Sequence, residues 1–469
     1  MTSVKLEGRL ITPAKVEGLA DVYTTTNFTL LKSRWISDDE VSTCQWCKNK
    51  FNQLRRKHHC RQCGNVFCSK CCNEKIPLPQ LGIEDPERVC ESCRPVTEFI
   101  TKSRSPLQNY KSEAAVNLVN QCGEISGLCK VVELGGVQTL IVLAKNESLS
   151  PVIQSKVISG LQILSTHQPL HKYLAEAGAI KAICSILTKT DLSFEQTLVE
   201  GISTLKIFCR LPDLKSKALE DGVLEPVLRL SCTSHCNAVS LVAVSTLSLI
   251  AEDTNTHKMI LDSPLNVLSS VCSLATSDDE QMQEVSLKTL CFLSLGSSWQ
   301  KHRIVQEDFT AGQSVRKAIR GEPKNQQVLC NAACLIANLA TSSEDQGGLQ
   351  ELLDGLGDLL KRDLTNPNLQ CHVARGLANF ARFQQNATKI KNMLPLVIFK
   401  CLKSTNSHIK MHAMRAVFNV MSINPSDTCS ELLRDGAGEL LEGLSRLKGL
   451  TSAIQDALLA QAPDLVRPQ

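Results

Sequence analysis

The chain lacks any long hydrophobic run. Over 469 residues, no stretch approaches the roughly 18 consecutive apolar residues of a membrane-spanning helix. The charged and polar start from Met1 to Arg9 does not resemble a signal peptide. Aromatic residues make up only 4%, and the net charge is only +4, which leaves little for stacking on nucleobases or for bulk attraction to nucleic acid. The composition therefore favours a cytoplasmic protein that binds no nucleic acid.

Motifs of catalysis are missing as well. The sequence has no glycine-rich loop for cradling phosphates, no nucleophile elbow and no pair of carboxylates spaced for acid–base chemistry. These absences predict that the protein is not an enzyme.

Cysteine, by contrast, is abundant, and its distribution is uneven. Of 22 cysteines, eight lie in four Cys-x-x-Cys pairs between Cys44 and Cys93, and Cys72 stands beside one pair. The other thirteen are scattered through a region rich in Leu, Ala and Val. Scattered cysteines in apolar surroundings behave as small buried hydrophobic residues that stay reduced. This pattern favours the cytosol over a secreted disulfide framework.

The four pairs have the spacing of zinc ligands. They are Cys44/Cys47, Cys60/Cys63, Cys68/Cys71 and Cys90/Cys93, separated by twelve, four and eighteen residues. Each pair offers two thiolates, and a structural zinc ion takes four in a tetrahedron. Eight sulfurs therefore predict two closed structural Zn²⁺ sites, with no open position for catalysis.

The chain divides into four parts. Residues 1–34 form a leader without recognisable chemistry, and residues 35–98 form the cysteine-rich unit. A short linker at 99–110 precedes residues 111–462, which have a helical pattern. A unit as small as 35–98 cannot bury enough surface to fold alone, so zinc must supply folding free energy. The long helical part is large enough for its own core.

The helical part repeats. A similar apolar helix recurs, and its equivalent positions are spaced by 40 to 47 residues: Gln162, Lys206, Ser248, Cys291, Asn338, Asn379 and Asn419. A shorter apolar segment precedes each helix and often opens on a glycine turn, as at Gly135, Gly178, Gly222 and Gly355. Such a period is typical of armadillo and HEAT repeats, which stack into a solenoid. The sequence therefore predicts a mainly α fold: a small zinc domain followed by an α-solenoid.

Three further elements accompany the cysteine pairs. Trp35-Ile36-Ser37-Asp38 precedes the first pair, Arg56-Lys57-His58-His59-Cys60-Arg61 covers the second, and Arg88-Val89-Cys90 opens the fourth. Together they resemble the FYVE domain, which reads phosphatidylinositol 3-phosphate on endosomal membranes. The resemblance covers residues 35–98 and implies a cross-brace fold with two interleaved zinc sites. The implied ligands are Cys44, Cys47, Cys68 and Cys71 for one zinc ion, and Cys60, Cys63, Cys90 and Cys93 for the other. Cys72 falls outside this pattern.

The residues themselves suit such a lipid. A phosphate monoester needs convergent charged donors, and guanidinium groups supply forked ones. Zinc ligation on either side of Arg61 and beside Arg88 fixes both backbones, so these donors are held in place. His58 and His59 titrate near neutral pH and would bind phosphate best when protonated. The resemblance assigns the headgroup to Arg56, Lys57, His59, Arg61 and Arg88, with His58 beside them, and the ring hydroxyls to Asp38.

The loop before the basic run is expected to meet the bilayer. In the FYVE family this tip carries exposed apolar residues, whereas here it reads Asn52-Gln53-Leu54-Arg55, with Leu54 as its one apolar residue. Burying one Leu contributes roughly 1.5–3 kcal/mol, and each basic residue adds about 1 kcal/mol on an anionic surface. We therefore expect specific but weak binding by a monomer, strengthened by a second contact or by homodimerisation.

The repeats resemble armadillo repeats in their Gly-x-(Ile/Leu) turns and Leu-x-Asn-(Leu/Phe) helix endings. In that family the late-helix asparagine holds an extended peptide, which implies a peptide groove at Asn338, Asn379 and Asn419. The other interpretation is that these asparagines only bridge helices. His408 and His412 lack a third metal ligand and are interpreted as ordinary helix residues, and the Lys and Arg residues of the solenoid as a solvated face.

Three classes of function stay open. The first is a non-enzymatic adaptor in membrane trafficking, peripheral on early endosomes, whose zinc domain reads phosphatidylinositol 3-phosphate while its repeats bind an unidentified protein. The second is a RING-like ubiquitin ligase, or a zinc-dependent interaction module without lipid binding. A RING normally includes a His ligand, which the all-cysteine pairs lack. The third, a nucleic-acid-binding zinc protein, lacks a basic recognition helix.

Overall fold

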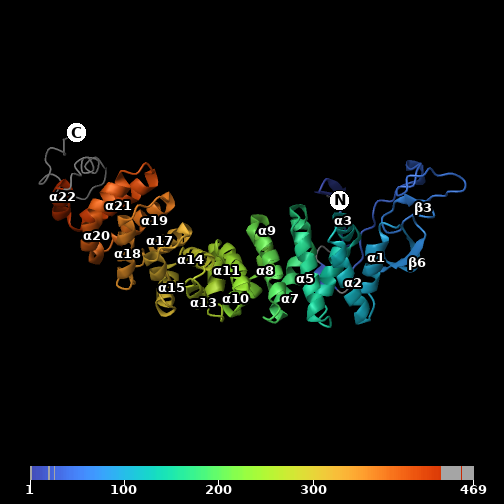
Figure 1. Ribbon diagram of the computed structural model, residues 1–469, viewed down its shortest axis with the longest axis horizontal. Coiled ribbons are helices and arrows are strands. Elements are labelled where there is room, and N and C mark those ends of the chain that lie inside the picture. Colours follow the sequence, from blue (N-terminus) through green and yellow to red (C-terminus); the bar gives the residue numbers. More distant parts are fainter. Residues whose placement is uncertain (1–2, 19–21, 26, 435–455, 457–469) are drawn as a thin grey trace. The chain divides into compact units, whose positions relative to one another are not determined.

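The computed structural model describes residues 3–18, 22–25, 27–434 and 456. The chain forms two compact units, Met1–Ile250 and Ala251–Gln469, and each is described by itself (Figure 1). The end of the predicted solenoid, from residue 435 to 462, lies outside the described residues except for Asp456.

The described strands all lie in the first unit and form three short antiparallel pairs. They are β1 (Val4–Leu6) with β2 (Arg9–Ile11), β3 (His58–His59) with β4 (Val66–Phe67), and β5 (Glu74–Leu78) with β6 (Ile83–Val89). The last two pairs belong to the zinc domain, and β3 and β6 contact each other. So small a sheet has little apolar surface to bury, which is consistent with a domain held together by metal.

The helix α1 (Arg94–Ser103) crosses the boundary expected at residue 98. It begins directly after the last cysteine of the fourth pair and packs against β5 on one side and α2 (Gln108–Gln121) on the other. Val96 and Ile100 are buried in this contact region. The segment 99–110, expected as a polar linker, is therefore helical at both ends. It joins the zinc domain to the helical repeats through packed helices.

The leader is ordered against the rest of the first unit. Its β1–β2 hairpin leads into a segment whose Ala14 N–H donates to the Val132 carbonyl at 2.9 Å. Further along, the Leu30 N–H donates to the Gln80 carbonyl of the zinc domain at 2.7 Å. Leu30 is buried, and its side chain lies over Gly135, where an added Cβ would come within 2.7 Å of it. The leader thus contacts both the zinc domain and the first helical repeat.

The helical part of the first unit consists of three-helix repeats. The helices are α3 (Ile125–Leu134), α4 (Gly136–Ala144) and α5 (Pro151–Ser165); α6 (His171–Ala177), α7 (Ala179–Lys189) and α8 (Glu195–Arg210); and α9 (Pro212–Glu220), α10 (Leu224–Thr233) and α11 (Asn237–Ala251). Gly135, Gly178 and Gly222 stand between the first and second helix of each repeat with φ of 97°, 96° and 88°. That left-handed conformation strains other residues, so the predicted glycine turns are confirmed at these three positions.

The second unit continues the pattern. Its helices are α12 (His257–Leu261), α13 (Val267–Leu274) and α14 (Glu280–Leu293); α15 (Ser298–Thr310), α16 (Ser314–Arg320) and α17 (Gln326–Leu339); α18 (Gln350–Lys361) and α19 (Pro367–Phe380); α20 (Gln384–Leu396), the π-helix η6 (Val397–Leu402) and α21 (Ser407–Ile423); and α22 (Pro425–Arg434). The turn expected at Gly355 is wrong, because Gly355 lies inside α18. A Cβ there would stand 3.0 Å from Ile319, so this glycine allows close helix packing.

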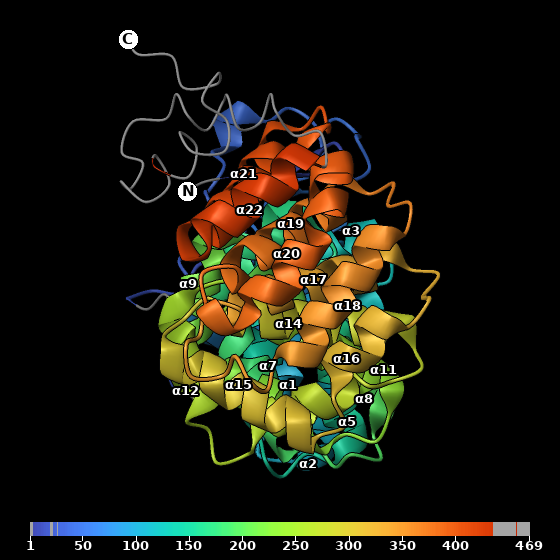
Figure 2. The same ribbon diagram turned by 90° about the vertical axis from the view of Figure 1, so that its left-hand side faces the viewer.

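The predicted repeating helices are the long last helices of the repeats, called third helices below although the repeat of α18 and α19 has two described helices. In the second unit, α14, α17, α19 and α21 pack in sequence, and Figures 1 and 2 both show α17, α19 and α21 side by side. Their Leu, Ala and Val side chains are buried almost completely. Repeats of three helices stacked in this way make the predicted armadillo-like solenoid fold, and the mainly α class is confirmed.

The described part of the chain has no single helix long and apolar enough to span a membrane. The pair α3 and α4 has the necessary length and composition only together, and the two helices meet at a bend of 76°.

Candidate functional site

The eight paired cysteines converge in two groups of four. One group contains Cys44, Cys47, Cys68 and Cys71, and the other contains Cys60, Cys63, Cys90 and Cys93. Within each group the sulfur atoms lie within 4.8 Å of one another. The first and third pairs therefore meet, as do the second and fourth, in the interleaved order of a cross-brace.

The sulfur geometry fits zinc. Four thiolates at about 2.3 Å from one tetrahedral Zn²⁺ lie about 3.8 Å from each other. The sulfur atoms of Cys47 and Cys68 are 3.8 Å apart. The prediction of two structural zinc sites is thus confirmed. Each site takes four protein ligands from two segments of the chain. A bound zinc ion therefore cross-links these segments and supplies folding free energy.

Neighbouring N–H groups favour the thiolate form in the first group. The Asn49 backbone is the main cause that lowers the pKa of the Cys47 thiol to about 6. The Asn49 amide also donates to the Cys47 sulfur at 3.2 Å, and the Cys68 N–H donates to the Cys44 sulfur at 3.3 Å. Such donors orient metal ligands and stabilise their negative charge.

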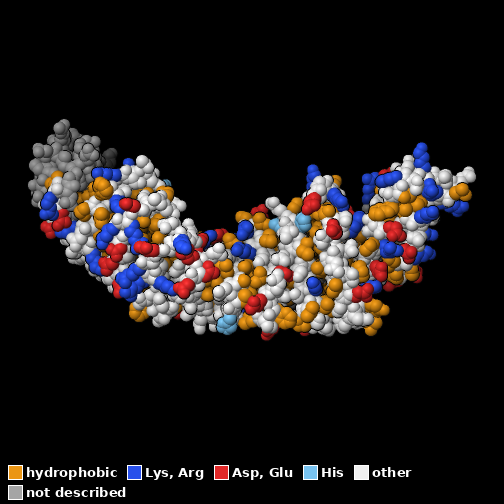
Figure 3. All heavy atoms as spheres, in the orientation of Figure 1, with side chains coloured by type: hydrophobic (Ala, Val, Ile, Leu, Met, Phe, Trp, Pro, Cys, Tyr) orange, Lys and Arg blue, Asp and Glu red, His pale blue; other side chains and the backbone are white. Residues whose placement is uncertain are grey.

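The predicted headgroup residues come together on β3, β6 and the loops beside them. His58 and His59 form β3, and Arg88 lies near the end of β6, which contacts β3. The Arg61 N–H donates to the Arg88 carbonyl at 2.9 Å, so the two arginines share a main-chain pairing. Figure 3 shows Lys and Arg side chains gathered at the end of the first unit where β3 lies.

His58 lies among positive charges. Burial lowers the pKa of its imidazole, and the nearby charges of Arg88 and Arg56 lower it further. These positive charges disfavour a second positive charge on the imidazole ring. A bound anion would reverse that repulsion, because it neutralises the arginines and favours the protonated ring.

His59 is more tightly held than the sequence alone indicates. Its ring stacks on Trp35 with centroids 4.0 Å apart, and its Nε2 lies 2.8 Å from the Ile36 carbonyl. The same Nε2 is 3.8 Å from a carboxylate oxygen of Asp38. The Trp35–Asp38 segment and the basic run thus fold onto each other, which places Asp38 at the edge of the cluster.

Both zinc-flanking arginines already have partners. The Arg61 guanidinium lies 5.1 Å from the centre of the Trp35 ring, and its Nε is 3.4 Å from the Glu87 carboxylate. Arg88 donates from Nη1 to the Cys72 carbonyl at 2.9 Å. Glu87 was not predicted at this site, although its place directly before Arg88 was a signal. Cys72, which falls outside the predicted ligand pattern, contributes its main-chain oxygen.

Lys57 and Arg56 complete the basic run. The Lys57 ammonium donates to the Asp38 carbonyl at 2.6 Å, while Arg56 is exposed. Asp38 begins the short helix η2 (Asp38–Glu40), which is fixed by a capping box between Ser37 and Glu40. The predicted cluster is therefore assembled in one place.

Leu54 stands at the tip of its loop with 97% of its surface exposed. The Asn52 side chain accepts hydrogen bonds from the Leu54 and Arg55 N–H groups, at 3.0 and 2.8 Å, and so fixes the turn. Trp46, between the first two zinc ligands, is 55% exposed. An aromatic ring was not expected on this surface.

The asparagines of the predicted peptide groove are engaged inside the solenoid. Asn338 and Asn379 are buried, and Asn379 and Asn419 donate to the Ala337 and Ala378 carbonyls of the preceding helices at 2.7 and 2.9 Å. Asn338 donates to the Ser294 hydroxyl at 2.8 Å. In the described structure these amides bridge neighbouring repeats, and the peptide groove stays a prediction.

Comparison with known proteins identifies the zinc domain. Residues 34–98 match the family model of the FYVE zinc finger. Lateral signaling target protein 2 homolog of Brugia malayi is 44% identical over 64 residues, which cover 14% of this chain and 10% of that protein. The 1-phosphatidylinositol 3-phosphate 5-kinase of Mus musculus is 44% identical over 66 residues, 14% of this chain and 3% of the kinase. The chain thus matches a tenth or less of the length of these relatives.

The helical repeats resemble solved structures of engineered proteins. One crystal structure of an engineered protein has a TM-score of 0.54 at 20% identity and covers 80% of this chain and 99% of its own. A designed armadillo repeat protein has a TM-score of 0.44 at 19% identity, covering 53% and 99%. The first likeness supports the fold alone. The molecule therefore combines a FYVE zinc finger with an armadillo-like solenoid.

Proposed function

We propose that the protein is a non-enzymatic adaptor that binds phosphatidylinositol 3-phosphate on endosomal membranes through its zinc domain and a protein partner through its helical repeats. One observation carries the lipid part: His58 and Arg88 lie on the contacting strands β3 and β6, and a main-chain hydrogen bond joins Arg61 to Arg88 on a zinc-fixed scaffold. Similarity to a kinase whose name includes this lipid supports the same ligand.

The headgroup phosphate would bind between the guanidinium groups. Phosphate accepts forked hydrogen bonds from arginine, and its charge exceeds that of one carboxylate. Arg61 would exchange its 3.4 Å contact with Glu87 for the phosphate, while the Trp35 ring holds the guanidinium in place. Asp38 would accept hydrogen bonds from ring hydroxyls and repel a lipid phosphorylated at those positions.

Leu54 would enter the bilayer beside the headgroup. Its near-complete exposure leaves its apolar surface available, and the Asn52 turn holds it at the tip. Transfer of one leucine contributes roughly 1.5–3 kcal/mol. This gain adds to the headgroup contacts of a single chain, and a second contact would add avidity.

The test is co-sedimentation of the full-length chain with liposomes that carry each phosphoinositide in turn. We expect selective pelleting with phosphatidylinositol 3-phosphate. Arg61→Gln should weaken it by roughly tenfold or more, since a charged hydrogen bond to phosphate contributes about 1.5–3 kcal/mol. Leu54→Ala should weaken it less and without loss of selectivity.

Arg94→Gln is the matched control, because Arg94 carries the same charge in the same domain but pairs with Glu91 and Glu74. Its binding should stay close to that of the wild type. Pelleting that ignores the position of the phosphate, or that is equally sensitive to Arg94 and Arg61, would refute the lipid site.

A further inference from the structure

Three consecutive third helices of the second unit carry no acidic residue. The sequences of α17, α19 and α21 contain neither Asp nor Glu, and the three helices pack side by side (Figure 2). The described basic side chains of α19 and α21 are His372, Arg375, His408, Lys410, His412 and Arg415.

Most of these basic side chains share one face. Arg382 lies in the turn just after α19. On α19 itself, His372 and Arg375 are three positions apart, and on α21 His408, His412 and Arg415 follow each other at intervals of four and three positions. Such spacings place side chains on the same side of a helix. Arg375 and Arg415 are half-buried, whereas Arg382 and His408 are exposed. We call the surface that carries Arg375, Arg382 and Arg415 the cationic face; His372, His408 and His412 lie beside these arginines in the sequence.

The two half-buried arginines are held by neutral groups. Arg375 donates to the Asn338 amide oxygen at 2.8 Å and to the Cys334 carbonyl at 3.2 Å, and its Nε is buried without a hydrogen-bond partner. Arg415 donates to the Asn379 amide oxygen and contacts the His412 ring. Amides therefore fix both guanidinium groups without neutralising their charge.

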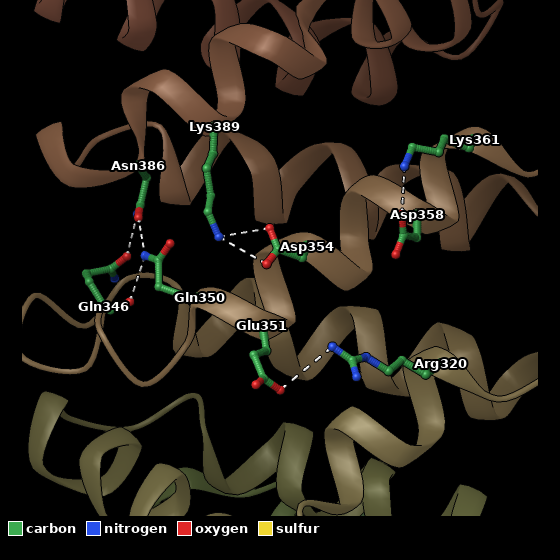
Figure 4. A network of polar contacts seen from close by, with 9 residues as sticks. All are labelled: Arg320, Gln346, Gln350, Glu351, Asp354, Asp358, Lys361, Asn386 and Lys389. Atoms are coloured by element: carbon green, nitrogen blue, oxygen red, sulfur yellow. Dashed lines mark hydrogen bonds and ion pairs between the residues drawn. The ribbon is translucent and has the colours of Figure 1, made fainter.

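The charges near the cationic face are of one sign. Burial, together with the charges of Arg382 and Arg375, lowers the pKa of Arg415. None of the three arginines forms an ion pair with a carboxylate among the described residues. Other faces of this unit differ: Figure 4 shows Lys389 paired with Asp354, Lys361 with Asp358 and Arg320 with Glu351. The cationic face thus keeps its charge available for a ligand.

We propose that the cationic face binds an acidic, extended segment of a partner protein, with Arg375 and Arg415 as its anchors. This inference rests on the proposed role of the repeats in binding a protein, and it adds the site and the chemistry of the partner. Carboxylate or phosphate groups of the partner would form ion pairs with the two guanidinium groups, whose charge the amides do not neutralise.

The spacing of the anchors suits an extended peptide. Packed helices lie roughly 8–10 Å apart. A polyproline II segment brings every third side chain to the same side after roughly 9 Å. Acidic residues at every third position would therefore face successive helices.

A membrane fits this face less well. Both anchors are recessed among helix side chains, and the Nε of Arg375 is fully buried. A flat bilayer attracts protruding lysines and arginines, whereas a narrow chain reaches recessed ones.

The experiment uses the full-length chain and fluorescent peptides of repeated Glu-Pro-Ser, Gln-Pro-Ser and Lys-Pro-Ser, measured by fluorescence anisotropy. We expect binding of the glutamate peptide alone, weakening as salt rises. Arg375→Gln combined with Arg415→Gln should weaken it by roughly tenfold or more, as expected for two charge pairs. Arg382→Glu tests the same face without risk to folding, because its side chain is exposed.

Lys410→Gln is the control, since it removes one positive charge from another side of α21. It should change the affinity by less than about twofold. Equal binding of the glutamate and glutamine peptides, or equal effects of the Lys410 and Arg382 variants, would overturn the inference. So would binding of phosphatidylserine vesicles through Arg375 and Arg415 with no binding of the peptide.

The experiments distinguish failure of the lipid site from failure of the peptide site. Arg375→Gln with Arg415→Gln should leave pelleting on phosphatidylinositol 3-phosphate liposomes unchanged, and Arg61→Gln should leave peptide binding unchanged. Pelleting with the lipid but no binding of the peptide would contradict this inference and still support the lipid site. Absence of both would remove the adaptor function.

Discussion

Arg61 and Arg88 illustrate what single residues reveal before a structure is known. The resemblance to the FYVE domain assigned both to one headgroup, and the main-chain hydrogen bond from Arg61 to Arg88 shows that their backbones lie together. Their present partners, Glu87 and the Cys72 carbonyl, were not predicted. The spacing of zinc ligands predicts where a backbone lies. Which nearby acceptor an arginine side chain binds depends on its rotamer, which packing determines.

For the asparagines and arginines of the repeats, the sequence predicted the positions but not the contacts. Asn338 and Asn379 were recognised from their place in the repeat, but their use depends on side chains from the next repeat. Arg375 and Arg415 occupy the positions from which they reach those amides. The arginines were interpreted as a solvated face, because a single helix pattern does not reveal contacts between repeats.

His372 and His412 predict a stability that depends on pH. Burial lowers the pKa of each to about 4, with Arg375 and His412 acting on His372, and Arg415, Arg375 and His408 acting on His412. The unfolded rings titrate near 6.5. Between these values the unfolded chain binds protons that the folded chain does not, so stability is full above pH about 6.5 and falls as pH drops towards 4.

Thermal unfolding followed by circular dichroism from pH 7.5 to pH 5 would measure this effect. After allowance for solvent screening, we expect a loss of Tm of roughly 2–4 °C, equivalent to about 1 kcal/mol in a unit of this size. Replacing both histidines by glutamine should flatten the dependence. An unchanged slope in that variant would assign the pH effect to other groups.

At the scale of elements, the repeating helices were the most predictable part. A buried helix returning every 40 to 47 residues needs only local hydrophobic patterning, so the third helices α5, α8, α11, α14, α17, α19 and α21 all contain the predicted segments. The turn at Gly355 was wrongly predicted because a glycine in a sequence usually indicates a turn. Here it allows close packing against Ile319, a contact that the sequence does not reveal. The helix α1 was not predicted because most of its residues are polar and only Val96, Thr97 and Ile100 are buried.

The zinc domain and the helical repeats should respond differently to metal removal. Strong chelators should unfold the zinc domain, since its small sheet depends on two cross-links, while most of the far-ultraviolet helical signal persists. Metal analysis should give two Zn²⁺ per chain, and Cys60→Ser should lose at least one. Cys72→Ser is the control, because Cys72 is buried nearby but belongs to neither group of ligands, and it should keep both ions. Full zinc content in Cys60→Ser would contradict the assigned ligands.

At the scale of the first unit, the leader was the least predictable segment. Its contacts are main-chain hydrogen bonds to residues distant in sequence, such as Val132 and Gln80, and no local pattern encodes them. The Arg104 guanidinium adds a contact with the Phe28 ring at 4.7 Å. Through these bonds the leader fixes the zinc domain on the first helical repeat, so a membrane-bound zinc domain would hold that repeat in a set orientation.

The proposed adaptor function requires one chain to bind the lipid and the partner at the same time. The measurement that tests it most directly adds fluorescent Glu-Pro-Ser peptide to liposomes containing phosphatidylinositol 3-phosphate, with and without the full-length chain, and records the fluorescence of the pellet.

We expect the peptide to pellet only when the chain and this lipid are both present. Arg61→Gln should remove the chain and the peptide from the pellet together. Arg375→Gln with Arg415→Gln should remove the peptide alone. A chain that pellets on any anionic liposome, or that pellets while the peptide stays in the supernatant, would contradict the account.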